Sequence, residues 1–210
     1  PFSLGNWGAT EWSSDKYKRN IYGTPSDSCG DYAWIQHMIC SMSSGKGRMA
    51  VVMPQGILFR GNQEAEIRKQ LVESNLIEAV VTLGDKLFYG TGLSPCFLII
   101  RRMKQAHHSG RILMIDGSKI LTQKRAQNIL EENDIDRLYS LYQNYSDEED
   151  YSRIVTLQEI RDKEYNLSPN RYVVYHKEEI RPYAEVLAEF KQAYADVKRL
   201  ENEFSLLINA

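Results

Sequence analysis

The sequence predicts an α/β protein, in which part of a doubly wound sheet with one antiparallel strand pair is followed by a mainly helical C-terminal region. Short apolar, β-branched runs alternate with helical segments over the first half of the chain, as in sheets with helical crossovers. Two of these runs, 77–83 and 96–100, follow one another without a helix between them. From about residue 178 the apolar residues recur every three or four positions, which indicates one long helix.

The first elements are a loop, a helix and a strand. Residues 1–29 are rich in Gly, Ser, Trp, Asn and Pro without a period, which predicts a loop. A helix is expected over 30–44, with Trp34 among the residues on its apolar face. The short run 48–53 is of the kind that is buried on both sides in a parallel sheet.

The next elements complete the predicted sheet. A second helix is expected over about 62–74, and a further strand over 111–115. Because strands 77–83 and 96–100 have no helical crossover, we expect them to pair antiparallel around the loop 84–95. With about four strands, the sheet is smaller than a complete doubly wound domain, so its first half is expected to lie outside these residues.

The composition changes after Gly117, and the chain is predicted to have three parts. Residues 1–118 carry the sheet. Residues 119–176 are a polar connector with a short strand and short helices, and residues 177–210 form the long C-terminal helix.

The bulk numbers indicate a soluble protein. Hydrophobic residues make up 42% of the 210 residues, and no apolar run approaches the roughly 18 residues that a membrane span needs. The formal net charge is −2, whereas proteins that grip DNA alone usually carry a basic face. The chain opens with neither Met nor a basic secretory start, so we expect it to be a piece of a longer protein.

Few residues suggest a metal site or a nucleotide loop. Three cysteines without Cys-x-x-Cys spacing predict neither disulfides nor zinc, and favour the cytoplasm. The pair Gly45 and Gly47 precedes a strand, whereas a phosphate-binding loop follows one. The four histidines lack ligand spacing, and the adjacent His107 and His108 are expected to be exposed.

Several segments together resemble one family. Pro1-Phe2 is similar to the end of the Asn-Pro-Pro-Phe motif of DNA amino-methyltransferases. In order and spacing, the following segments resemble the modification subunit of type I restriction–modification systems: Gly30–Met38, Gly47–Gly61, Glu66–Lys69, Leu87–Cys96 and Tyr165–Val173. The resemblance covers nearly the whole chain and implies a class I methyltransferase fold, of which residues 1–118 would be the C-terminal half of the catalytic domain.

The resemblance also implies a reaction, the transfer of a methyl group from S-adenosyl-L-methionine to N6 of a flipped adenine. It makes Pro1 and Phe2 the catalytic residues, with Phe2 stacking on the base. The Asn and first Pro of the motif are absent, as is the glycine-rich turn that binds the cofactor in this fold. We therefore expect no cofactor-binding residues here and an inactive fragment.

A second contact to the target base is expected from the loop between the last two strands. Related enzymes place such a contact there, and the candidates are Phe88, Tyr89 and Thr91. The glycines of this loop could equally serve only a tight turn.

The C-terminal helix carries a coiled-coil-like apolar seam. Its residues are Leu187, Phe190, Tyr194, Val197, Phe204 and Leu207, with Leu200 between them. Such a seam either packs on its own domain or docks on a partner. The resemblance implies double-stranded DNA, a DNA specificity subunit and a restriction subunit as partners, and a homodimer of the fragment could cover the seam instead. Two other functions stay open, a non-catalytic interaction module and a methyltransferase that acts on RNA or protein.

Overall fold

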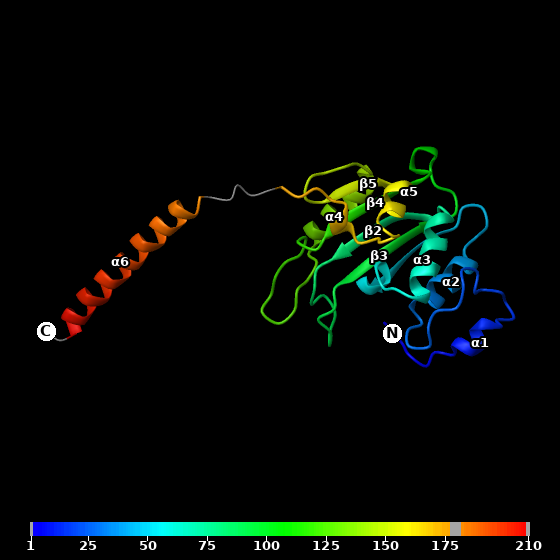
Figure 1. Ribbon diagram of the computed structural model, residues 1–210, viewed down its shortest axis with the longest axis horizontal. Coiled ribbons are helices and arrows are strands. Elements are labelled where there is room, and N and C mark those ends of the chain that lie inside the picture. The colour runs from blue at the N-terminus through cyan, green and yellow to red at the C-terminus, as the bar shows by residue number, and fades with distance from the viewer. Residues whose placement is uncertain (1, 177–181, 209–210) are drawn as a thin grey trace. The chain divides into compact units, whose positions relative to one another are not determined.

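The computed structural model describes residues 2–176 and 182–208, with the side chains of 206–208 left aside (Figure 1). The chain divides into two compact units, Pro1–Tyr175 and His176–Ala210, and each is described by itself. None of the described helices is long and apolar enough to cross a membrane.

The first unit is built on a five-stranded sheet with the order β1-β3-β2-β4-β5. The strands are β1 (Arg48–Pro54), β2 (Ile77–Leu83), β3 (Pro95–Arg101), β4 (Arg111–Gly117) and β5 (Ser152–Thr156). The predicted antiparallel pairing of β2 with β3 is confirmed, and β2 also pairs parallel with β4. The α/β class and the mixed sheet are therefore as expected. Because β5 lies within 119–176, this range contributes to the same sheet as residues 1–118, and the functional division between them stays a prediction.

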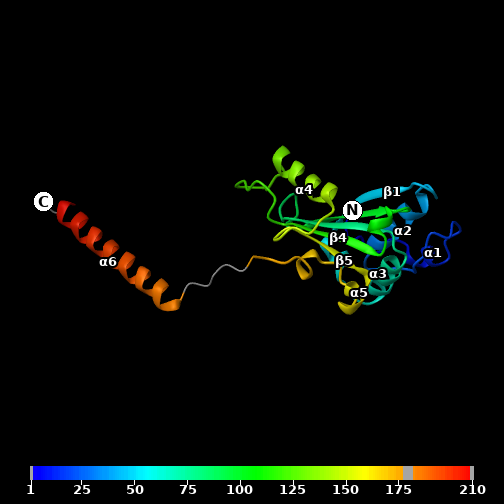
Figure 2. The same ribbon diagram turned by 90° about the horizontal axis from the view of Figure 1, so that it is seen from above.

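Helices cover both faces of the sheet, as Figure 2 shows with α4 on one side and α2, α3 and α5 on the other. The α-helices are α1 (Ala9–Ser13), α2 (Asp31–Ser41), α3 (Gln63–Glu73), α4 (Glu132–Asn144), α5 (Leu157–Asp162) and α6 (Tyr183–Ile208). Three 3-10 turns cover Gln55–Leu58, Ala106–His108 and Pro169–Arg171. The predicted helices are found, and the short α1 is an addition to the expected loop 1–29.

The strand β2 shows why the core has two layers. Every residue of β2 is buried, and successive side chains point to opposite faces. Val80 lies in the cluster with Ile39 of α2 and Leu71 of α3. Its neighbour Val81 lies in the cluster with Leu141 of α4.

Two predictions about burial were wrong. Strand β1 is not buried on both sides: in the described residues it pairs only with β3, and Arg48 and Ala50 are exposed. Trp34 is 48% exposed. The buried stripe of α2 runs through Tyr32, Ile35 and Ile39, which places Trp34 on another side of the helix.

The expected exposure of His108 was also wrong, since this side chain is buried. Its ring stacks on Tyr145 with centroids 3.4 Å apart, and its Nδ1 lies 3.4 Å from Glu78 Oε1. Tyr145 follows α4 directly, so a contact with a residue distant in sequence covers a segment that is locally polar.

Candidate functional site

The chain directly after Phe2 is fixed to the start of α2. The backbone N–H of Ser3 donates to Asp31 Oδ1 at 2.8 Å, and the Ser3 hydroxyl donates to Oδ2 at 3.3 Å. Asp31, the first residue of α2, is 1% exposed, and the thiol of Cys29 also donates to it at 3.2 Å. A buried carboxylate therefore holds the backbone next to Phe2.

Arg60 neutralises this carboxylate and a second one. Its Nη2 donates to Asp31 Oδ2 at 2.5 Å, and its Nε donates to Glu64 Oε2 at 2.5 Å. Burial opposes the charge of Arg60, but the hydrogen bonds to Glu64 and Asp31 outweigh it and raise the pKa of Arg60. A Cβ on Gly56 would lie 2.6 Å from Arg60 Nη1, so a side chain at this turn would displace the guanidinium from its present position.

Cys29, Asp31 and Glu64 place one ligand atom each within 4.8 Å of one another, close enough for a metal ion to be considered. The guanidinium of Arg60 already contacts both carboxylates and supplies the positive charge that a cation would bring. Burial raises the pKa of Cys29 to about 11, so the thiol keeps its proton and acts as a donor. We therefore describe the group of Ser3, Cys29, Asp31, Arg60 and Glu64 as an anchor for the N-terminal segment.

The anchor places Phe2 beside Phe88. Their ring centroids are 5.9 Å apart with an interplanar angle of 86°, an edge-to-face contact. Both rings are partly exposed, at 36% and 40%. The structure thus brings together two residues that are 86 positions apart and that the sequence assigns to the base site, although their role stays a prediction. Pro1 lies outside the described residues.

The other residues of the loop between β2 and β3 are arranged differently. Tyr89 is 92% exposed, and the hydroxyl of Thr91 accepts a hydrogen bond from the Leu93 N–H at 3.1 Å within the loop. Gly90 has φ +75°, a value that L residues rarely adopt. The glycine therefore serves a tight turn, and the base contacts of Tyr89 and Thr91 stay predictions.

The base of this loop is tied to the sheet. The Gln55 side chain donates to the carbonyls of Leu83 and Pro95, at 3.1 and 3.4 Å, and so joins the end of β1 to the end of β2 and the start of β3. The Asn128 side chain donates to the carbonyl of Asp85 at 3.1 Å. A cavity of about 290 Å³ lies beside Phe88 here, with mainly apolar walls.

The residues present do not form a site for S-adenosyl-L-methionine of the kind that this fold uses. Such a site lies on a glycine-rich turn that joins a strand to a helix. Within the described ranges, β5 leads into α5 through Thr156 without a glycine, and β1 leads only into the 3-10 turn Gln55–Leu58.

Sequence reasoning missed the role of Asp31, Arg60 and Glu64. Their pairing joins segments 29 positions apart, which no local period shows. The available signal was the resemblance itself, because Asp31 and Arg60 lie inside two of the segments that resemble the modification subunit.

The helix α6, taken by itself, presents one apolar face. Phe190, Tyr194, Val197 and Phe204 are each more than half exposed on it, and Leu187 less so. The rings of Phe190 and Tyr194 stack with centroids 6.3 Å apart. The side chain of Leu207 lies outside the described residues.

The comparison with protein families decides the assignment. The family model described as N-6 DNA Methylase matches residues 1–180. The chain belongs to this N-6 DNA methylase family. The type I restriction enzyme MjaVII methylase subunit of Methanocaldococcus jannaschii is 35% identical over 97% of this chain and 36% of its own length. The HindI methylase subunit of Haemophilus influenzae is 30% identical over 88% of this chain and 44% of its own length.

Solved structures of the family have the same fold. The type I restriction–modification methyltransferase subunit from Streptococcus thermophilus matches 82% of this chain and 36% of its own chain, with a TM-score of 0.75 and 28% identity. The EcoKI M protein matches 88% of this chain with a TM-score of 0.55 and 17% identity, which shows the fold alone. The chain spans little more than a third of the first two curated relatives, at 36% and 34% of their lengths.

Proposed function

We propose that this chain is part of the modification subunit of a type I restriction–modification system, an N6-adenine DNA methyltransferase. The observation that carries the proposal is the anchored edge-to-face pair of Phe2 and Phe88, in a chain of the N-6 DNA methylase family. An adenine flipped out of double-stranded DNA would stack on Phe2. The loop with Phe88, Tyr89 and Thr91 would contact the same base from the side.

The chemistry of the exocyclic amine explains why a motif ending in Pro-Phe suits this reaction. The lone pair of the adenine amine is delocalised into the ring, so the amine is a poor nucleophile. Acceptors at its hydrogens favour the tetrahedral geometry that attack requires, and in the proposed subunit an Asn side chain and a Pro carbonyl supply them. Phe2 holds the ring plane while this happens. S-adenosyl-L-methionine, the donor that methyltransferases use in general, would bind to residues beyond these 210.

The proposal places the base-binding residues in this chain and the cofactor-binding residues outside it. A calorimetric titration of the chain with S-adenosyl-L-methionine tests this assignment. We expect no binding and no methyl transfer, because the described residues lack the glycine-rich turn. A methylase subunit that carries the chain together with the cofactor-binding part should bind the cofactor in the same titration. A clear micromolar isotherm with the chain alone would mean that the cofactor site has been misplaced.

The proposal extends to partners and location. A DNA specificity subunit would define the methylated site and a restriction subunit would join the complex, since several relatives are described as subunits of type I restriction enzymes. The free state of Cys29, Cys40 and Cys96 supports a cytoplasmic location. The apolar face of α6 would dock on the specificity subunit.

Replacing Phe190 and Phe204 by Ser should separate docking from packing. Burying one Phe side chain contributes roughly 1.5–3 kcal/mol, so docking predicts at least a tenfold weaker complex with the specificity subunit and an almost unchanged melting temperature. The control is Gln192→Ser with Glu203→Ser, on the opposite side of α6. Wild-type co-purification of the Phe variant would contradict docking, and a lower melting temperature would indicate packing on the first unit. Gel filtration shows whether a second copy covers the face instead.

A further inference from the structure

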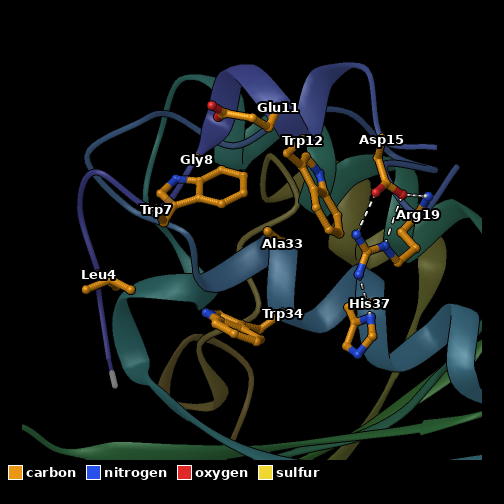
Figure 3. A pocket seen from close by; sticks show the side chains of 10 residues that line it. All are labelled: Leu4, Trp7, Gly8, Glu11, Trp12, Asp15, Arg19, Ala33, Trp34 and His37. Carbon is orange, nitrogen blue, oxygen red and sulfur yellow. Dashed lines mark hydrogen bonds and ion pairs between the residues drawn. The ribbon is translucent and has the colours of Figure 1, made fainter. Parts of the chain in front are cut away.

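A pocket of about 380 Å³ lies between the N-terminal segment and α2. All three tryptophans of the chain, Trp7, Trp12 and Trp34, line it together with Leu4 and Ala33 (Figure 3). Its volume falls in the range of roughly 300–1,000 Å³ that is usual for small-ligand sites. Neither the anchor nor the Phe2–Phe88 pair accounts for this concentration of indoles.

Trp34 presents a half-exposed indole to the pocket. It is 48% exposed, although its neighbours Ala33 and Ile35 on α2 are buried. Trp7 and Trp12 contact each other edge to face at 5.9 Å, whereas no ring or cation in the described part of the chain stacks on Trp34. A large amphipathic ring in this state is typical of a binding hot spot.

On the polar side of the pocket, His37 offers an oriented donor. Arg19 Nη1 lies 3.3 Å from His37 Nδ1, and a guanidinium can only donate. Nδ1 therefore accepts, which leaves the ring proton on Nε2. Because no partner of this N–H is found in the described residues, a ligand with a ring nitrogen or a carbonyl oxygen could accept from it.

The charged groups at the pocket disfavour a phosphate and already occupy one cation position, the one over Trp12. The guanidinium of Arg19 already lies 4.9 Å from the Trp12 ring centroid, in the position where an alkylammonium ion would be attracted. Arg19 is itself paired with Asp15 at 2.5 Å, and its hydrogen bonds lower the pKa of Asp15 to about 2. A phosphate would meet the carboxylates of Asp15 and Glu11 at the pocket wall. A neutral planar ring with acceptors has neither conflict.

We propose that this tryptophan pocket binds a nucleobase of the DNA, unstacked close to the target adenine. The base would stack on Trp34 and accept a hydrogen bond from His37. Leu4, at the pocket, is two residues from Phe2, so their Cα atoms lie within about 7 Å. The inference rests on the proposed function only in that DNA is the polymer that carries the base.

The experiment uses the 210-residue chain and a short single-stranded oligodeoxynucleotide. Because every tryptophan lines the pocket, selectively excited tryptophan fluorescence reports on it alone. We expect quenching by the oligonucleotide, but not by an abasic strand of the same length or by tetramethylammonium. Anisotropy of a labelled strand should show about tenfold weaker binding for Trp34→Ala, or about 1.4 kcal/mol, because the base loses its stacking contact.

Two variants make the result interpretable. Trp34→Phe keeps an aromatic face and should bind with intermediate affinity, and Tyr139→Ala removes a similarly exposed ring from α4 and should bind normally. Equal binding of the abasic strand, quenching by tetramethylammonium alone, or normal binding by Trp34→Ala would each overturn the proposal. The binding experiment needs no cofactor, so it is independent of methyl transfer. If the methylase proved inactive while the chain still bound bases, the proposed function would be wrong and the nucleobase pocket would remain supported.

Discussion

Replacing Arg60 by Met is expected to lower the free energy of unfolding by about 3 kcal/mol, the lower end of the usual loss for a buried ion pair, because Arg60 itself is 30% exposed. The side chains of Asp31 and Glu64 are 1% and 6% exposed, and Arg60 makes a salt bridge to each. Without the guanidinium, two carboxylates stay buried close together. Urea denaturation of the 210-residue chain measures the change.

Arg161→Met is the matched control. Arg161 pairs with Glu73 at 2.7 Å, but both side chains are more than a third exposed, so its loss should cost about 1 kcal/mol or less. Adding Asp31→Asn and Glu64→Gln to Arg60→Met should recover part of the stability, because the uncompensated charges are then gone. If the Arg60 variant lost no more free energy of unfolding than the Arg161 variant, the anchor would contribute little to stability.

Replacing Phe2 by Ala, in a methylase subunit that carries this chain, should slow methylation roughly 5- to 150-fold. The estimate follows from the roughly 1–3 kcal/mol that stacking of a base on an aromatic ring contributes. Phe2→Tyr and Phe2→Trp keep an aromatic face and should retain much of the activity. Single-turnover methylation of hemimethylated DNA, with the specificity subunit present, is the measurement.

The control for Phe2 is Phe59→Ala, which removes an exposed phenylalanine that directly follows the turn after β1. This variant should methylate at the normal rate. If the Phe2→Ala subunit also methylates at the normal rate, Phe2 is not the stacking residue. We assign to Asp31 the role of fixing the position of Phe2. A double variant of Asp31 and Phe2 should therefore methylate little more slowly than the Phe2 variant alone.

Local patterns predicted most of the fold. The apolar runs 77–83 and 96–100 predicted the strands β2 and β3, and the absence of a helix between them predicted their antiparallel pairing. The position of β1 at the edge of the sheet that the described residues form was not predictable in this way, because an apolar run does not show whether a strand has one neighbour or two. The burial of His108 depends on Tyr145, 37 positions further along, and so has no local signal.

The candidate site was predicted through resemblance more than through pattern. Phe2 and Phe88 were named because matching segments of a known family carry such residues, and the structure places their rings in contact. The anchor and the tryptophan pocket could not be predicted from the sequence, and the reason is physical. Both are assembled from residues of several segments, and the charged members Asp31, Arg60 and Glu64 look like ordinary surface residues until their partners are known.

The outer edge of β1 has a consequence for handling the protein. Backbone donors and acceptors along Arg48–Pro54 have no second strand beside them in the described residues, and Met49–Met53 between these ends is uncharged and apolar. Such an edge is a template for strand pairing between molecules. At high concentration this edge of the chain therefore favours intermolecular β-pairing, which the charge of Arg48 at one end and Pro54 at the other oppose.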